Sequence, residues 1–232
     1  MASAAPAMDP ATRAAVLRAN AERGVAAAQR AWGQVLLDGS DGVARDQREG
    51  FRWFWRAAGA GDVEALNMVG RCYDQGWGVA VDPARAAECF RVAAARGHAW
   101  GMYNYATALT LGAGVPEDRP AALALFRAAA GMGCAKAANY VGSFHEDGWV
   151  VERNLAEAER HYRVAAEGGD FRGAFNLARL VADPVEAQDW LEACGRTATP
   201  AFLARAEAWL AAAPQPHLRA GIARLREGAA TC

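Results

Sequence analysis

A spacing of 36 residues recurs along this chain, and this period constrains the fold more than any other feature. It appears independently in glycine, valine, alanine and an aromatic position. The four series are Gly61, Gly97, Gly133 and Gly169; Val43, Val79, Val115 and Val151; Ala58, Ala94, Ala130 and Ala166; and Phe54, Phe90, Phe126 and Tyr162. A period of about 20–50 residues is typical of a solenoid, in which each unit buries its apolar face on its neighbours. Such folds present an extended concave surface more often than a catalytic pocket.

The clearest unit, residues 63–98, predicts two helices joined by a loop. Apolar residues from Ala65 onward follow the i, i+3, i+4, i+7 spacing of one helical face, which we name helix A. The glycines of the segment at 76–79, Gly-Trp-Gly-Val, end this helix. Asp82 is expected to cap a second helix, helix B, which Gly97 ends. Each unit is therefore predicted to be a helix-turn-helix repeat.

The pattern divides the chain into four segments. We expect residues 1–8 to be disordered and residues 9–24 to form an N-terminal capping helix. Residues 25–195 hold four full repeats and one truncated repeat, and residues 196–232 form C-terminal capping helices. In the fourth repeat Val150 replaces the second loop glycine, which leaves the shape of that loop open.

The repeat unit resembles the signature of the Sel-one-like repeats, which are relatives of the tetratricopeptide repeats. The match covers roughly residues 24–195, and Leu109 and His145 depart from it because the signature has tyrosine there. The resemblance implies an all-α fold, a right-handed α-solenoid with helical caps, and adaptor function. In the unit at 63–98 the signature is carried by Ala65, Val69-Gly70, Tyr73, Gly76 to Val79, Asp82, Ala86, Phe90, Ala93-Ala94 and Gly97.

Composition argues against several classes of partner. The formal net charge is −1, so the chain lacks the basic stripe that nucleic-acid binding requires. We expect no membrane insertion, because no stretch approaches 18 uncharged apolar residues, and no signal peptide. A cytoplasmic location follows, and the alanine- and arginine-rich usage is bacterial in style. The five cysteines form no CxxC motif and are expected to be reduced thiols; Cys72 and Cys89 lie on the two helices of one repeat, so a disulfide between them stays open.

The sequence contains little that points to an enzyme. The four histidines show neither HxxxH nor HExxH spacing, and we expect no metal and no cofactor. His145-Glu146-Asp147 is the one candidate cluster for a catalytic general base. It supports an alternative hypothesis, in which the protein is an enzyme or an enzyme-accessory domain that uses His145 and nearby carboxylates. His145 occupies the tyrosine position of the repeat, which favours a packing role. A third hypothesis is a self-assembling structural protein that uses some of the eight tryptophans.

The helix A positions outside the signature are the best candidates for binding. In the related tetratricopeptide arrays helix A lines the concave groove, and two rows one turn apart share that face here. Asparagine both donates to and accepts from a peptide backbone, aromatic rings offer apolar platforms, and arginine pairs with carboxylates. We therefore expect a non-enzymatic scaffold, with a monomer favoured, that binds a peptide or protein segment in this groove. The rows are Arg30, Asn67, Tyr103, Asn139 and Phe175, and Gln34, Arg71, Thr107, Ser143 and Arg179.

Overall fold

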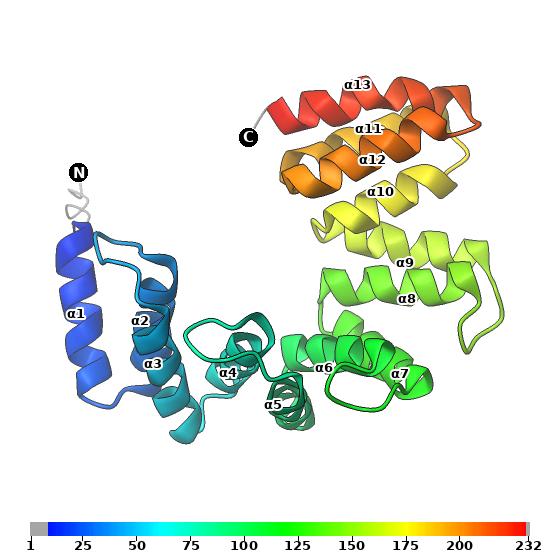
Figure 1. The fold of residues 1–232 in the computed structure, drawn as a ribbon. Coiled ribbons are helices and arrows are strands. Elements are labelled where there is room, and N and C mark those ends of the chain that lie inside the picture. The colour runs from blue at the N-terminus through cyan, green and yellow to red at the C-terminus, as the bar shows by residue number, and fades with distance from the viewer. Residues whose placement is uncertain (1–8, 231–232) are drawn as a thin grey trace, which may run out of the picture. The chain divides into compact units, whose positions relative to one another are not determined.

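The computed structural model describes residues 9–230, which contain thirteen α-helices and no strand (Figure 1). The all-α prediction is therefore confirmed for this part of the chain. Residues 1–8, for which we predicted disorder, lie outside the described residues. The chain forms two compact units, residues 1–117 and 118–232, and the boundary falls inside the third repeat.

The first unit contains six helices. They are α1 (Pro10–Glu22), α2 (Ala26–Asp38), α3 (Gln47–Gly59), α4 (Val63–Gln75), α5 (Pro83–Ala95) and α6 (Ala99–Leu111). Here α2, α4 and α6 are A helices, and α3 and α5 are B helices. Consecutive helices of this unit pack against each other in antiparallel pairs, as the helix-turn-helix prediction requires.

The second unit contains seven helices. They are α7 (Arg119–Gly131), α8 (Ala135–Asp147), α9 (Leu155–Glu167), α10 (Phe171–Leu180), α11 (Pro184–Thr197), α12 (Pro200–Ala212) and α13 (Pro216–Ala230). The A helices are α8 and α10, and the B helices are α7, α9 and α11. The last helix, α13, continues to Ala230 at the end of the described residues.

The caps explain why the period produces these helices. Each B helix of the four full repeats begins after an Asp or Asn whose side chain accepts a hydrogen bond, 2.9–3.1 Å long, from the backbone N–H three residues on. Each A helix of these repeats ends at a glycine in the left-handed region, which glycine adopts without a Cβ penalty. The caps are Asp46, Asp82, Asp118 and Asn154, and the stops are Gly39, Gly76, Gly112 and Gly148.

A glycine inside helix A lets the two helices of a repeat approach closely. A Cβ on Gly70 would lie 2.6 Å from the ring of Phe90, and one on Gly142 would lie 2.6 Å from the ring of Tyr162. Phe90 and Tyr162 are buried and contribute to the core of their respective units. The helix A glycine thus permits tight helix–helix contact in both units.

The fourth loop keeps the backbone conformation of the others despite its substitution. Val150 has φ 53°, in the left-handed region that Gly78 (φ 70°) and Gly114 (φ 74°) occupy in the earlier loops. For a residue with a Cβ this conformation costs roughly 1–2 kcal/mol. The fourth loop therefore keeps the shape that the repeat imposes, and the Val150 backbone is strained in it.

The C-terminal helices cover the last repeat. Leu191 of α11, Leu210 of α12 and Leu225 of α13 are fully buried in one cluster with residues of α9 and α10. At the crossing of α11 and α13, Gly195 and Gly228 bring the two backbones into close contact. In residues 9–230 there is no helix long and apolar enough to cross a membrane.

Candidate functional site

In each unit two A helices lie side by side and are joined by a pair of asparagines. Asn104 of α6 donates a hydrogen bond of 2.8 Å from Nδ2 to Oδ1 of Asn67 on α4. Asn176 of α10 makes the same bond, 2.9 Å, to Asn139 on α8. The partners are 37 residues apart in both cases, so the bond joins successive repeats. We name these two pairs the asparagine ladder.

The ladder changes the role expected for two of the predicted groove residues. Asn67 is only 4% exposed and Asn139 only 6% exposed. Their side chains are therefore used between repeats and are not open for a peptide, contrary to our expectation. The sequence rows missed Asn104 and Asn176, although their offset of one position from the period was a visible signal.

Three other row residues of the first unit remain accessible. Arg71 is exposed, and its guanidinium lies 4.8 Å from the ring centroid of Trp77. Tyr103 is half-buried and packs edge-on against exposed Trp100, with the ring centroids 5.7 Å apart. The hydroxyl of Thr107, one turn further, donates to the carbonyl oxygen of Tyr103 at 2.9 Å. This part of the unit thus has exposed cationic and aromatic groups.

A hollow of about 270 Å³ adjoins these residues. Tyr103, Asn104 and Thr107 line it from α6, and Asp74 lines it from the end of α4. The hollow therefore brings two predicted row residues, Tyr103 and Thr107, and one ladder residue, Asn104, around one concave space.

In the first repeat both row residues are held by neighbouring carboxylates. Arg30 forms ion pairs with Asp62 at 3.1 Å and with Glu64 at 3.0 Å. Gln34 donates to Asp38 at 2.7 Å. These side chains are only partly buried, but their hydrogen bonds are already made within the chain.

In the second unit the C-terminal helices cover part of the row. Phe175 is buried beneath Phe202 and Trp209 of α12, with ring centroids 5.6 Å apart in both cases, so it is not the open platform that we expected. This cover is not predictable from the repeat pattern, because α12 lacks the repeat signature. Trp209 itself is 40% exposed and takes the place of Phe175 as the accessible ring.

Arg179 and Ser143 belong to a polar network beside that ring. The Arg179 guanidinium lies 5.4 Å from the Trp209 ring centroid and donates to Glu146 at 3.0 Å. The Tyr162 hydroxyl donates to Glu146 at 2.6 Å, and its oxygen lies 3.2 Å from the Ser143 hydroxyl oxygen. An arginine on a tryptophan thus accompanies the asparagine ladder in each unit.

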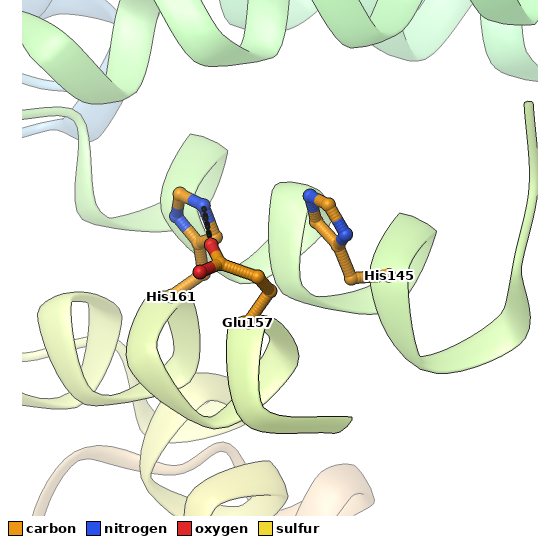
Figure 2. A group of neighbouring side chains, drawn as sticks. All are labelled: His145, Glu157 and His161. Carbon is orange, nitrogen blue, oxygen red and sulfur yellow. Dashed lines mark ion pairs between the residues drawn. The ribbon is translucent and has the colours of Figure 1, made fainter. Parts of the chain in front are cut away.

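The base cluster suggested for His145 is not formed. Glu146 faces Tyr162 and Arg179 instead, while the groups near the His145 imidazole are Glu157 and His161 of α9 (Figure 2). The rings of His145 and His161 are nearly parallel, with centroids 5.8 Å apart. The spacing of the histidines along the chain does not indicate this trio, because His145 and His161 lie on different helices. The i, i+4 spacing of Glu157 and His161 is the signal that the sequence carries.

The cysteines of the described part are free thiols. Burial raises the pKa of Cys72 to about 12 and that of Cys89 to about 11. It also raises the pKa of Cys194 to about 12. Within residues 9–230 the structure therefore contains no disulfide, and the pair at Cys72 and Cys89 is reduced.

Comparison with known families gives four matches to the model described as the Sel1 repeat, at residues 26–62, 63–98, 101–134 and 135–170. Together these matches cover more than half of the chain. The chain belongs to the Sel1 repeat family. Proteins of this family are typically non-catalytic scaffolds and generally act as protein–protein interaction modules.

Solved Sel1 repeat structures share this fold. A Sel1 repeat protein from Oxalobacter formigenes is 21% identical with a TM-score of 0.75, over 94% of this chain and 99% of that one. A protective antigen of uropathogenic Escherichia coli with an SLR fold is 26% identical with a TM-score of 0.69; the match covers 96% of this chain but only 50% of that protein. An immunity protein from Pseudomonas aeruginosa is 19% identical with a TM-score of 0.54, over 80% and 69% of the two chains.

The Sel1 repeat register separates structural from candidate positions. Signature residues such as Gly70 and Phe90 are explained by close packing. The accessible Arg71, Tyr103 and Thr107 lie outside the signature and are not needed for that packing. These helix A side chains are therefore the positions that the packing of the repeat does not explain.

Proposed function

We propose that this Sel1 repeat protein is a non-enzymatic scaffold that binds a peptide or protein segment along the exposed side of its A helices. The observation that carries the proposal is the group formed by Arg71 on Trp77 with Tyr103 and Thr107 beside the hollow in the first unit. In related tetratricopeptide arrays the corresponding helices line the concave groove.

The chemistry of this surface suits an extended segment that carries an acidic side chain. The Arg71 guanidinium is preoriented by the Trp77 ring and is exposed, so it can pair with a carboxylate without losing the stacking contact. Tyr103 offers an aromatic face to such a segment. In the second unit, Arg179 on Trp209 is the corresponding group.

Selection from a random peptide library on the immobilised full chain tests the proposal. The affinity of selected peptides is then measured for wild type, Arg71→Ala and Tyr103→Ala. We expect each variant to bind roughly 5- to 30-fold more weakly, because residues central to a binding site contribute about 1–2 kcal/mol.

Two matched controls lie on B helices. Arg91→Ala removes an exposed arginine of α5, and Trp55→Ala removes an exposed aromatic ring of α3. Peptide affinity is expected to stay within about twofold of wild type for both, as for surface positions outside an interface. Selection of no peptide, or equal losses in the controls and in the A-helix variants, would refute the assignment.

We further propose that the protein works as a monomer in the bacterial cytoplasm and does not bind nucleic acid. The free thiols of Cys72, Cys89, Cys134 and Cys194 suit a reducing compartment, and the formal net charge of −1 provides no attraction for phosphates. Sedimentation at several concentrations is expected to give one monomeric species. Association that Trp55→Ala abolishes would instead support the self-assembly hypothesis, since Trp55 is 55% exposed.

A further inference from the structure

A second site lies on the fourth repeat, between α8 and α9. His145 projects from α8, and Glu157 and His161 project from one face of α9, a single helical turn apart (Figure 2). One ligand-type atom from each of the three side chains lies within 4.8 Å of the others. These residues line an open hollow of about 530 Å³ together with Arg127 and Arg160. The arrangement is the one place in residues 9–230 where at least three potential metal ligands meet.

The packing of the repeat does not require these side chains. The positions equivalent to these three side chains lie 72 and 36 residues earlier in the chain. They hold an aromatic, a cationic and a thiol residue in the second repeat, and only apolar residues in the third. Only the fourth repeat has ligand types at all three positions; the first repeat has Glu49 at the Glu157 position, and the second has Cys89 at the His161 position. The equivalents of His145, Glu157 and His161 are Tyr73, Arg85 and Cys89, then Leu109, Ala121 and Leu125.

The donor atoms are in the protonation states that a cation needs. Burial lowers the pKa of His145, and burial with the nearby Arg160 charge lowers the pKa of His161 to about 4. Both imidazoles are therefore neutral at pH 7. Hydrogen bonding from Arg160 lowers the pKa of Glu157, which is an anion at that pH.

Arginine side chains show where the imidazole lone pairs point. Nη2 of Arg127 lies 3.3 Å from Nε2 of His145, and Nη2 of Arg160 lies 2.9 Å from Nε2 of His161. Guanidinium can only donate, so both Nε2 atoms accept and their lone pairs face the hollow. Both arginines are exposed and can turn into solvent, leaving these lone pairs to another cation.

We propose that His145, Glu157 and His161 bind a divalent transition-metal ion of the zinc class, which clips α8 to α9. Two imidazole nitrogens and one carboxylate oxygen are a common ligand set for zinc, with a fourth position left for water or a partner's side chain. Tetrahedral zinc at the usual bond lengths separates its ligand atoms by about 3.3 Å. The side chains must therefore draw together from 4.8 Å, by roughly one to two ångströms.

Rotation of the side chains supplies this adjustment. Nδ1 of His145 has no hydrogen-bond partner in the described part of the chain, so no second bond fixes the orientation of that ring. An anion fits the site less well, even though two arginines border it. Both imidazoles turn their Nε2 lone pairs toward the arginine side chains that border the hollow, and a lone pair repels an anion but can bind a cation.

Titration of the full chain with zinc chloride, followed by calorimetry at pH 7.5, tests the site. Cys232→Ser serves as the background, because its thiol lies outside the described residues and would compete for zinc. The variants His145→Leu, Glu157→Ala and His161→Leu take the residues that the chain itself carries in the third repeat, so the fold is expected to tolerate them.

We expect one zinc per chain and a loss of affinity of about 100-fold or more in each variant, since even partners of metal ligands contribute 10- to 100-fold. His98→Asn is the control: it removes an imidazole elsewhere and keeps a side-chain acceptor at the N-terminus of α6. Its zinc affinity is expected to equal that of the background protein. Cobalt should give the intense visible absorption of a four-coordinate ion, lost in the three ligand variants.

Arg160→Gln separates a metal site from an anion site. It removes the guanidinium that competes for His161 and Glu157, so zinc should bind more tightly. The proposal is overturned if zinc does not bind the background protein, or if the ligand variants bind it as tightly as His98→Asn. It is also overturned if inorganic phosphate binds instead and Arg160→Gln abolishes that binding.

Discussion

The asparagine ladder predicts a measurable coupling between successive repeats. The Asn139 side chain is 6% exposed and accepts a hydrogen bond of 2.9 Å from Asn176. Asn139→Ala removes this acceptor. The bond itself contributes about 0.5–1.5 kcal/mol net. Asn176 still accepts its second hydrogen bond, from Arg179. Because Asn176 is half-buried, water can replace only part of the lost hydrogen bond to its amide nitrogen. Asn139→Ala is therefore expected to lower the free energy of unfolding by about 1–2 kcal/mol.

A double-mutant cycle isolates the bond. Asn139→Ala, Asn176→Ala and the double variant are unfolded in urea and followed by circular dichroism, with the same denaturant slope required of all four proteins. The coupling energy is expected to be about 1 kcal/mol. The same cycle at Asn67 and Asn104, where the bond is 2.8 Å, should give the same value.

Additive effects within about 0.3 kcal/mol at both pairs would refute the ladder as a link between repeats. The cycle also separates structure from binding. If the asparagines support the A helices and do not touch a ligand, peptide affinity should fall no more in Asn139→Ala than in a variant of equal stability loss elsewhere in the second unit.

Three further predictions concern packing and titration. Gly142→Ala should lower the free energy of unfolding by about 1–3 kcal/mol, because the added methyl group meets the Tyr162 ring. Gly131→Ala, at an open position of α7, should raise it by a few tenths of a kcal/mol. Equal effects of the two variants in urea unfolding would contradict the packing argument. Burial raises the pKa of Asp170, so its ionisation lowers the stability of the fold above that pKa. Asp170→Asn keeps the N-cap and should stabilise the protein at pH 7, with the gain gone below about pH 4, where the aspartate is protonated in the unfolded chain as well. A stability difference that does not depend on pH would contradict this prediction. Cys72 and Cys194, buried and with pKa values near 12, should resist alkylation at pH 8 until denaturant is added, and rapid labelling of the native chain would show that these sites open.

The repeat period predicts the fold so well because it coincides with helix starts and stops. Asp82 and Gly76 act through hydrogen bonds within three or four residues and through local backbone conformation, both of which the sequence displays directly. Val150 shows the limit of this local reading: the repeat imposes a left-handed conformation on a residue that disfavours it.

The candidate sites depend on contacts between elements, and here the sequence is less informative. The period places Asn67 and Asn139 on the correct helix face, but it does not show their burial. That burial arises from contact with the next repeat, whose asparagines, Asn104 and Asn176, lie 37 residues further along and not 36. Phe175 is covered by α12, a helix without the repeat pattern. His145 and His161 meet because helix A packs on helix B, which spacing along the chain does not express.

Amide hydrogen exchange of the full chain, with and without a selected peptide, tests the central claim most directly. The account predicts that the peptide slows exchange in α4 and α6 around Arg71 and Tyr103, and that Arg71→Ala removes this protection at the same peptide concentration. Protection confined to the B helices α3 and α5, or protection that Arg71→Ala and Tyr103→Ala leave unchanged, would contradict the proposal that the A helices form the binding surface.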